Sequence, residues 1–468
     1  MIYIRTYAYN AEKVIENAIK SILNQTYGEF RYYLLDNGST DGTRDIIRKY
    51  AEQDARIVPF YADKNFDQSV NKEFWNMIDY LQEDDLFCIL DGDDAYEPTF
   101  LEEMYVFLEE NKLDMAVCGS KFVDATSGKV IGEKVLTDSI VIWDGQQFGW
   151  FFPVIHWNLR QSWGKLFTAR VAKARYERNF PEWFPRAYGG DTANIYECVK
   201  VAERIGVYGK ALHLYTVSLD SVSHRWIEGR EKCDFILFEK AKELLEMKCG
   251  FVSDDNLSFL YGVQFYALRD TLNVLFGSSL PAERKIGIAK YLFCNTITKQ
   301  VFKESGCAEE ESKKELLHFF VSHLLNVAKE ADEAYLIEVA ECLTALNAGF
   351  KEMILSEDLK WYLNHMAEVV RHVALGEYER AINNLMGYFI NETENKKVPK
   401  SPVVLGQMLT ALRNDERNYV FFSKKLIMWY IEHEDIDSAK RELAEWMQLL
   451  PEDGELLMMQ KKMENRND

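Results

Sequence analysis

The chain has 468 residues, a formal net charge of −20 at pH 7 and a pI near 5.0. Its hydrophobic content of 47% and charged content of 28% are typical of folded domains in water. This length predicts two or three domains. The acidic balance disfavours binding to nucleic acid or to an anionic membrane through bulk charge.

Targeting and redox signals are sparse in the sequence. No apolar run reaches the roughly 18 residues of a membrane span, and β-rich sequence begins at Ile2 instead of a leader peptide. The eight cysteines are scattered without a C-x-x-C pair, which is typical of reduced core thiols and not of a zinc site or a disulfide framework. We therefore expect a cytoplasmic protein, with any membrane contact peripheral and at the inner face.

The first ninety residues alternate between two hydrophobic patterns. Short runs rich in β-forming residues occupy positions 2–7, 32–35, 57–61 and 87–90. Apolar residues recur at helical spacing in the segments between them, at 10–25, 44–54 and 71–81. This alternation predicts βαβ units and a mainly parallel sheet.

Polar turns follow three of the predicted strands, near Thr6, at Asp36 and at Asp91. Because ligands bind beyond the carboxyl ends of parallel strands, we expect these turns to open onto one crevice. The last turn carries three carboxylates in the sequence D-G-D-D at 91–94, which are costly side by side unless a cation is present. Hard divalent cations take carboxylate oxygens, although a solvated acidic turn is the alternative for so short a motif.

Several segments together resemble the family 2 glycosyltransferases of the GT-A fold. The strongest are I-R-T-Y-A-Y-N-A-E-K within 4–27, L-D-N-G-S-T-D-G-T at 35–43 and L-D-G-D-D at 90–94. S-W-G-K-L-F at 162–167, G-G-D-T at 189–192 and D-S-V-S-H at 220–224 extend the resemblance over roughly residues 1–226. The resemblance implies a GT-A, Rossmann-like domain with a mainly parallel mixed sheet.

Three positions depart from the family pattern. The first turn reads T-Y-A-Y-N where T-Y-N is more usual, Asn37 stands where a second aspartate is common, and Gly190 replaces a glutamate. The amide of Asn37 can both donate to and accept from a base edge, but it carries no charge. The nucleotide preference therefore stays open at this stage.

The resemblance implies an inverting, metal-dependent transfer of a sugar from a nucleotide diphosphate, with a UDP-sugar as the expected donor. Mn²⁺ or Mg²⁺ would be held by Asp93 and Asp91. His224 is a candidate further ligand, and an ordinary surface histidine is the equal alternative. The acceptor would be a hydroxyl of a glycan, a lipid-linked glycan or a peptide, and surface polysaccharide or glycoconjugate synthesis is the expected setting.

Asp191 is the candidate general base by the same resemblance, and a helix-capping role would be compatible with it. The predicted nucleotide-sugar-binding residues are Thr6, Tyr7, Asp36, Asn37, Asp91, Asp93 and Lys165. Two of these have structural alternatives. Asp36 could bond the amides of its own turn, and Lys165 could be a solvated lysine on a strand.

Helical periodicity dominates after about residue 226, which predicts an all-helical domain at 227–468 behind a transferase domain at 1–226. The windows 374–385 and 432–443 resemble tetratricopeptide hairpins, but they lie 58 residues apart instead of about 34. A linker with a possible sub-boundary is predicted at 391–401. The helical domain could bind the acceptor, form a homodimer, dock a partner protein or act only as a stabilising lid.

Three other functions compete with transfer to a glycan. A peptide or protein glycosyltransferase would use the helical domain to bind its acceptor. A catalytically degenerate protein would only recruit a partner, a reading favoured by Asn37 and Gly190 and opposed by Asp91, Asp93 and Asp191. A nucleotidyltransferase is disfavoured, because residues 6–13 lack a Gly- and Lys-rich loop.

Overall fold

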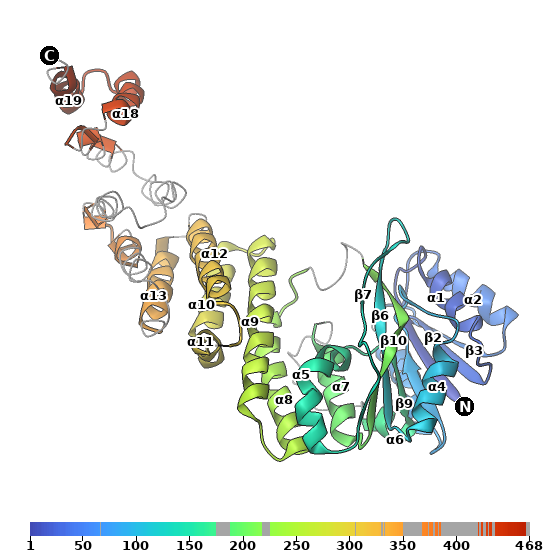
Figure 1. Ribbon diagram of the computed structural model, residues 1–468. Helices are drawn as coiled ribbons and strands as arrows, with labels where there is room; N and C mark the ends of the chain where they lie inside the picture. Colours follow the sequence, from blue (N-terminus) through green and yellow to red (C-terminus); the bar gives the residue numbers. More distant parts are fainter. Residues whose placement is uncertain are drawn as a thin grey trace. The chain divides into compact units, whose positions relative to one another are not determined.

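Figure 1 presents the computed structural model of the chain. It describes residues 1–65, 67–174, 188–217, 225–304, 306–328, 331, 333–349, 367–372, 374–377, 380–381, 383–384, 420, 423–424, 427–428, 430–432 and 436–464. Two compact units follow each other along the chain, Met1–Leu260 and Tyr261–Asp468. The predicted fold class, an α/β domain followed by a helical one, is confirmed.

The first unit is built on one mixed sheet with the strand order β3-β2-β1-β4-β9-β6-β10-β5. The strands are β1 Ile2–Ala8, β2 Phe30–Asp36, β3 Ile57–Tyr61, β4 Leu86–Ile89, β5 Ala95–Tyr96, β6 Met115–Asp124, β7 Val130–Lys134, β8 Ile140–Ile142, β9 Lys165–Thr168 and β10 Ile205–Val217. Strands β3, β2, β1 and β4 are parallel to one another, whereas β9 runs antiparallel to both β4 and β6. The sheet is therefore parallel on the side that carries the three polar turns.

The register of the parallel strands brings their carboxyl ends to one edge. Ala8 at the end of β1 lies opposite Asp36 at the end of β2, and Arg5 lies opposite Ile89 at the end of β4. The amide of Asn37 then donates to the carbonyl of Ala8 at 2.8 Å. The expected convergence of the three turns is confirmed by this geometry.

Helices connect these strands as the sequence pattern predicts, with shifted ends. They are α1 Ile15–Leu23, α2 Thr43–Gln53 and α3 Gln68–Asn76, the last continued by a 3₁₀ turn at Met77–Tyr80. The first helix begins five residues later than the predicted start at position 10. The reason is that Asn10 has a left-handed backbone with φ of 47° and that the amide of Ala11 donates to Thr43 Oγ1, which takes this stretch into a turn.

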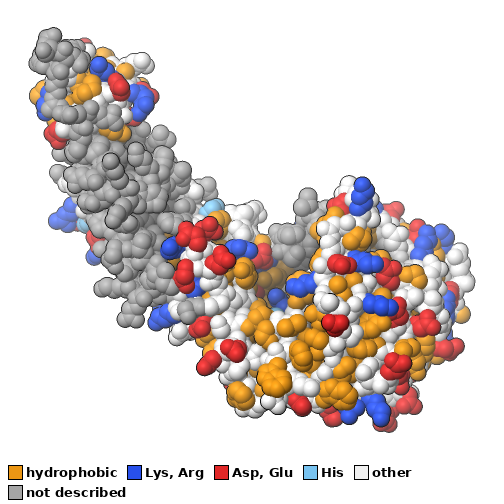
Figure 2. Space-filling model, viewed as in Figure 1, with side chains coloured by type: hydrophobic (Ala, Val, Ile, Leu, Met, Phe, Trp, Pro, Cys, Tyr) orange, Lys and Arg blue, Asp and Glu red, His pale blue; other side chains and the backbone are white. Residues whose placement is uncertain are grey.

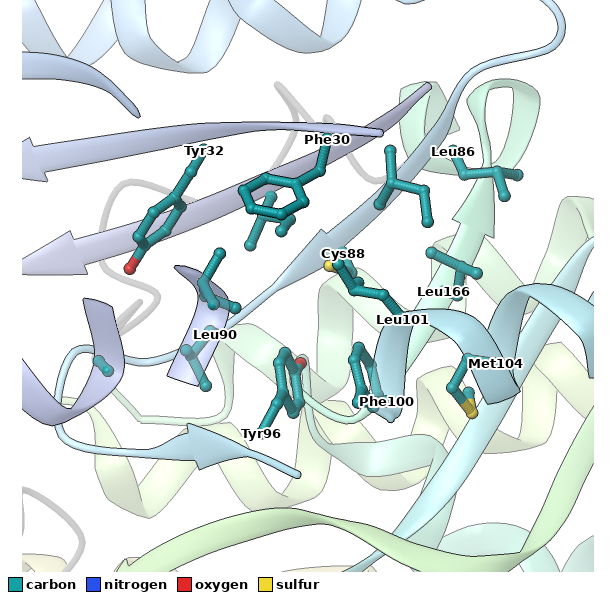
Figure 3. Close-up of a cluster of buried hydrophobic side chains, with 14 of the residues drawn as sticks. Phe30, Tyr32, Leu86, Cys88, Leu90, Tyr96, Phe100, Leu101, Met104 and Leu166 are labelled. Atoms are coloured by element: carbon teal, nitrogen blue, oxygen red, sulfur yellow. The ribbon is translucent and has the colours of Figure 1, made fainter. Parts of the chain in front are cut away.

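The main core of this unit lies between the sheet and helices that include α1 and α4, Phe100–Glu110. Phe30 and Tyr32 are two residues apart on β2 and therefore point to the same face of the sheet. Cys88 on β4 and Leu90 just after it belong to the same core cluster, as Figure 3 shows. Tyr96 stacks on the Phe100 ring with centroids 3.6 Å apart and 5° between the planes. Burial of side chains of this size stabilises the fold by roughly 1.5–3 kcal/mol each.

The remaining helices of the first unit are α5 Gly145–Arg160, α6 Ala169–Ala174, α7 Gly190–Val201 and α8 Arg230–Cys249. Helix α8 packs against α5 and α7, so the compact unit continues past position 226 to Leu260. The functional boundary at 226/227 stays a prediction. Figure 2 shows apolar side chains over the region of α5 and α8. Trp150 and Val154 on α5, Met247 on α8 and Phe251 just after it are exposed.

The second unit consists of helices over its described residues. Helix α9, Asp254–Gly277, crosses the boundary, and α10 Ala282–Cys294, α11 Thr296–Lys303, α12 Glu310–Ala328, α13 Glu333–Gly349, α18 Ile436–Leu449 and α19 Gly454–Glu464 follow. Ala381 and Ala439, at matching positions of the two repeat-like windows, are fully buried. Several other positions of the two repeat-like windows, including Leu385 and Glu434, and the predicted linker at 391–401 lie outside the described residues, so a repeat architecture stays a prediction.

Two predictions from composition can be compared with this structure. All eight cysteines carry free thiols, and five of them are buried. Among the described helices, none combines the length and the apolar character needed to cross a bilayer.

Gly206 on β10 allows a close approach that a side chain would prevent. A Cβ there would lie 2.4 Å from Leu113 Cδ1 and 2.6 Å from Phe107 Cε1. We predict that Gly206→Ala lowers the free energy of unfolding of the first unit by about 1–3 kcal/mol, because the core must shift to admit the methyl group. Urea denaturation followed by near-UV circular dichroism measures this loss.

Gly28→Ala is the matched control, since a Cβ at Gly28 would meet nothing within 4 Å. We expect a change within about 0.5 kcal/mol for this variant. Equal losses in the two variants would contradict the packing described around Gly206.

Candidate active site

The carboxylate turn, Asp91–Asp94, begins where β4 ends. The amide of Leu90 still bonds the Arg5 carbonyl of β1 at 3.0 Å, and the chain then turns through Gly92 into β5. A Cβ at Gly92 would lie 2.9 Å from the carbonyl oxygen of Tyr7, so only glycine lets this turn pass so close to the end of β1. The turn is thereby held against the first strand.

Electrostatics in this turn favour a cation. Asp93 reaches solvent, yet the surrounding protein removes enough water to raise the pKa of its carboxyl group above the ordinary value. Burial also raises the pKa of Asp94 well above its ordinary value, and the negative charge of Asp93 adds to that rise. A positive charge bound at this turn would stabilise both ionised carboxylates.

Asp94 is the internal anchor of the turn. One of its oxygens accepts from the amide of Thr216 on β10 at 2.7 Å, and the hydroxyl of Thr216 donates to the Asp93 carbonyl at 2.5 Å. Its other oxygen, Oδ2, lies 3.1 Å from His213 Nε2 without forming a hydrogen bond with it. The turn is therefore fixed to the edge of the sheet that carries β10.

His213 was not identified from the sequence. Its side chain is fully buried, stacks on Trp163 with ring centroids 4.3 Å apart, and places Nδ1 3.1 Å from Ser120 Oγ. Burial, with a smaller contribution from the charge of Lys165, lowers the pKa of His213 to about 3. The imidazole is therefore neutral around pH 7.

The predicted nucleotide side contains a network of amide side chains. The Tyr7 hydroxyl donates to Asn71 Oδ1, Asn71 Nδ2 donates to Asn37 Oδ1 at 3.2 Å, and Asn37 Nδ2 donates to Asn65 Oδ1 at 2.6 Å. Asn65 and Asn71 were not identified from the sequence, where nothing distinguishes them from other polar residues near the start of a helix. The network ties the ends of β1 and β2 to Asn65, which precedes α3, and to Asn71 within α3.

Thr6 and Asp36, both predicted to bind the nucleotide, form hydrogen bonds to other groups of the protein. Thr6 is buried, donates to the Leu90 carbonyl at 2.8 Å and accepts from the Tyr32 hydroxyl at 3.0 Å. Asp36 is fully buried, accepts from the amide of Ser39 at 3.0 Å and from Arg44 Nε at 2.7 Å. These contacts give both residues a structural role, which for Asp36 is the alternative that its turn sequence had left open.

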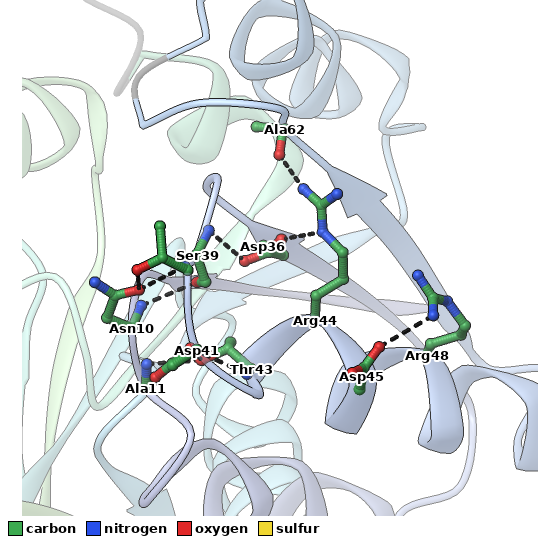
Figure 4. A network of polar contacts seen from close by, with 11 residues as sticks. Asn10, Ala11, Asp36, Ser39, Asp41, Thr43, Arg44, Asp45, Arg48 and Ala62 are labelled. Carbon is green, nitrogen blue, oxygen red and sulfur yellow. Dashed lines mark hydrogen bonds and ion pairs between the residues drawn. The ribbon is translucent and has the colours of Figure 1, made fainter.

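The unusual first turn, T-Y-A-Y-N, is hydrogen-bonded to the turn after β2, as Figure 4 shows. Asn10 Oδ1 accepts from the amide of Thr40 at 2.8 Å, and Ser39 Oγ accepts from the amide of Asn10 at 2.9 Å. Asp41 accepts from the amides of Glu12 and Thr43, both at 3.1 Å. The polar residues of G-S-T-D-G-T therefore hold two loops together.

Asp191, the predicted base, is exposed in the first turn of α7, whose N-cap is Gly189 with φ of 78°. Its Oδ1 accepts a hydrogen bond of 2.5 Å from the hydroxyl of Ser162, which is itself buried. Lys165 is buried at 1% exposure, so it is not a solvated lysine, and its Nζ donates to the Trp163 carbonyl at 3.3 Å. Ser162 was not identified from the sequence as a candidate site residue. It begins the S-W-G-K-L-F segment of the family resemblance, which could have pointed to it.

The other predicted metal ligand, His224, lies outside the described residues together with 218–223. Within the residues that are described, no three His, Cys, Asp or Glu side chains converge as a complete metal site. Asp91, Asp93, Thr6, Tyr7, Asp36 and Asn37 are all brought to the carboxyl edge of the parallel strands. Asp191 and Lys165 come from the β9–α7 side of the sheet.

A parallel sheet edge that carries an acid-rich turn after β4, flanked by the ends of β1 and β2, defines a GT-A domain. The family model described as Glycosyl transferase family 2 matches residues 4–146. Residues 4–146 of this chain are therefore similar to the family 2 glycosyltransferases.

Curated relatives are similar over parts of the chain. TuaG of Bacillus subtilis, a candidate teichuronic acid biosynthesis glycosyltransferase, is 29% identical over 119 residues, which are 25% of this chain and 46% of TuaG. Glycosyltransferase GlyA of Streptococcus pneumoniae is 24% identical over 234 residues, which are 47% of this chain and 31% of GlyA. The chain thus spans less than half the length of these two relatives.

Solved structures with low similarity include TarS 1–349 of S. aureus in complex with UDP-GlcNAc. It is 15% identical, has a TM-score of 0.41, and the match covers 86% of this chain and 93% of that one. A mannosyltransferase of Pyrobaculum calidifontis in complex with GDP-Man and Mn²⁺ is 14% identical with a TM-score of 0.35, over 68% of this chain and 86% of that one. Similarity at this level adds nothing to the argument from the site.

The Asp36–Arg44 pair gives a testable consequence of this geometry. Arg44 also donates to the Ala62 carbonyl, and Asp36 is fully buried. We predict that Arg44→Met lowers the free energy of unfolding by about 1–3 kcal/mol, because it leaves a buried carboxylate without its charged donor. Urea denaturation of the purified protein measures the difference.

Arg48→Met on the same helix is the control, because Arg48 pairs with Asp45 where both side chains are exposed, as Figure 4 shows. An exposed ion pair of this kind is worth about 0.3–0.5 kcal/mol. If Arg48→Met destabilised the protein as much as Arg44→Met, the structural role given to Asp36 would be wrong.

Proposed function

We propose that this chain is an inverting, metal-dependent glycosyltransferase that moves a sugar from a UDP-sugar to a hydroxyl acceptor. The observation that carries the proposal is the carboxylate turn, Asp91–Asp94, at the carboxyl edge of the parallel strands of a family 2 domain. Transfer from a nucleotide diphosphate needs charge neutralisation at the leaving diphosphate, and this turn is the acidic feature that could supply it through a cation.

The residues of this turn fit a hard divalent cation. Carboxylate oxygens are the ligands that Mn²⁺ and Mg²⁺ prefer, and both Asp93 and Asp94 have pKa values raised by loss of water. Asp93 and Asp91 would hold the ion, and His224 is proposed as the further ligand. Bound there, the ion would supply Lewis-acid stabilisation of the leaving diphosphate.

Asp191 is the proposed general base. Its exposed carboxylate at the start of α7 could accept the proton of an acceptor hydroxyl while Ser162 holds one of its oxygens. In-line attack on the face of the sugar opposite the diphosphate would invert the configuration at the anomeric carbon. The remaining protein groups would orient donor and acceptor and exclude water.

Donor recognition would involve Tyr7 and Asn37 at the ends of β1 and β2. Both belong to the amide network with Asn65 and Asn71, so a nucleobase would exchange hydrogen bonds with this network. Lys165 is proposed to favour the phosphates as a point charge from beneath the site. The uracil preference is supported only by the family resemblance.

The acceptor and the setting are proposed from the relatives and from the second unit. The name of TuaG supports a role in bacterial surface polysaccharide or glycoconjugate synthesis. A peptide acceptor held by the helical unit, or a homodimer or partner protein bound through it, is the alternative use of that unit. We propose a cytoplasmic location, with peripheral association at the inner face of the membrane.

The metal assignment is tested by calorimetric binding of UDP in Mn²⁺ and in EDTA. We predict that the wild-type chain binds UDP only with the metal, and that Asp93→Ala abolishes this binding because a ligand oxygen is lost. Asp84→Ala, an exposed residue in the turn before β4, is the control and should keep wild-type affinity. Unchanged UDP affinity in Asp93→Ala would remove the metal from this turn.

The base assignment is tested by separating binding from turnover. We predict that Asp191→Asn keeps metal-dependent UDP binding but lowers the release of UDP from a UDP-sugar by about 10²–10⁴-fold, because the attacking hydroxyl or water keeps its proton. Steady-state turnover of a panel of UDP-sugars, with water as the acceptor, measures the loss. Full activity in Asp191→Asn would place the base elsewhere.

A further inference from the structure

Three consecutive residues, Ser162, Trp163 and Gly164, each contact a different part of the proposed active site. They form the short connection between α5, which ends at Arg160, and β9, which begins at Lys165. All three are buried, with Ser162 at 2% and Trp163 at 9% exposure. A connection of this kind is unusual, because loops normally lie on the surface.

The first contact reaches the predicted base. Ser162 Oγ donates to Asp191 Oδ1 at 2.5 Å across 29 positions of sequence. A hydroxyl has a single proton to donate, so this bond fixes the orientation of the Ser162 side chain toward α7. Hydrogen bonds to a carboxylate are short and about twice as strong as neutral ones, which makes this bond suited to holding a side chain in one rotamer.

The second contact reaches the carboxylate turn. The Trp163 ring lies parallel to the His213 ring, with 12° between the planes and centroids 4.3 Å apart. His213 Nε2 in turn lies 3.1 Å from Asp94 Oδ2. Trp163 thus packs against the imidazole that lies next to Asp94, the buried carboxylate that anchors the turn.

The third contact reaches the strand that feeds this turn. The amide of Gly164 donates to the Tyr96 hydroxyl at 3.1 Å, and that hydroxyl donates to the Ile89 carbonyl at the end of β4 at 2.5 Å. The Gly164 carbonyl accepts from the amide of Cys118 on β6 at 2.9 Å. Gly164 has φ of 64°, a conformation that side chains disfavour, and it lets the segment make these bonds in a single turn.

We propose that Ser162–Gly164 is a positioning segment, which fixes the predicted base Asp191 relative to the carboxylate turn, and that Ser162 is the positioning residue for Asp191. This inference rests on the proposed transferase function. The leaving diphosphate and the acceptor hydroxyl must be held on opposite sides of one sugar carbon. A single connection that contacts both Asp191 and the carboxylate turn helps to keep the distance between these two groups constant. Ser162 itself does not exchange a proton with the substrate.

The test compares Ser162→Ala, Ser162→Thr, Asp191→Asn and the double variant Ser162→Ala/Asp191→Asn. Turnover is measured as UDP release from UDP-GlcNAc in Mn²⁺, and donor-site integrity as calorimetric binding of UDP in Mn²⁺. We expect Ser162→Ala to lower kcat about 10-fold or more while KM and the Kd of UDP stay within about twofold, because only the orientation of the base is lost. Ser162→Thr keeps the hydroxyl and should restore kcat to within about threefold of wild type.

The double variant separates positioning from a general structural effect. If Ser162 acts through Asp191, removing it in the Asp191→Asn background should change kcat by less than about twofold. An equal loss in both backgrounds, or a parallel loss of UDP affinity, would overturn the proposal, as would wild-type kcat in Ser162→Ala. Wild-type protein that neither binds UDP nor releases it from UDP-GlcNAc would overturn the proposed function as well, which distinguishes the two failures.

Discussion

The buried carboxylate of Asp94 is the constraint on which the candidate site depends. Its exposed neighbour Asp93 can face a ligand only if Asp94 stays inside, where loss of water opposes its charge. The amide of Thr216 on β10 offsets part of this cost by donating to one Asp94 oxygen, whereas the neutral His213 lies 3.1 Å from the other oxygen without a hydrogen bond. The turn is consequently held between two strands. Gly92 packs closely against the Tyr7 carbonyl of β1, and the polar contacts just described join the turn to β10.

The polar loops around this turn are joined to one another by hydrogen bonds. Asn10, Ser39 and Asp41 bond backbone amides of the opposite loop or of their own, and Asp36 receives Arg44 from α2. Buried polar groups that are fully hydrogen-bonded specify a single arrangement, whereas partly bonded ones would not. The residues that differ from the usual family pattern at the first turn therefore change how two loops are joined, while the carboxylate turn keeps its place.

Much of the fold could be predicted because hydrophobic periodicity reports burial directly. The strands at 57–61 and 87–90 and the helix at 44–54 lie within about one residue of β3, β4 and α2. The first helix was predicted five residues too early, since a turn bonded to a distant loop carries no periodic signal. Thr6 and Asp36 could be located from the sequence, but their structural contacts with Leu90 and Arg44 depend on pairings across the sheet and on α2.

The partners of the proposed catalytic residues were the hardest to foresee, for the same physical reason. Ser162 contacts Asp191, which is 29 positions away in sequence. His213 lies beside Asp94, which is 119 positions away. No local pattern encodes such a distance. The antiparallel pairing of β10 with β5 brings His213 beside Asp94, and the connection into β9, which lies between β4 and β6, carries Ser162. β9 also starts with the buried Lys165, whose Nζ donates to the Trp163 carbonyl. One strand therefore sets both the place of the positioning segment and that of a positive charge next to it. A change in the length of the connection before β9 would therefore disturb Asp191 and the carboxylate turn at once, which explains why a buried, tightly bonded connection occupies this place.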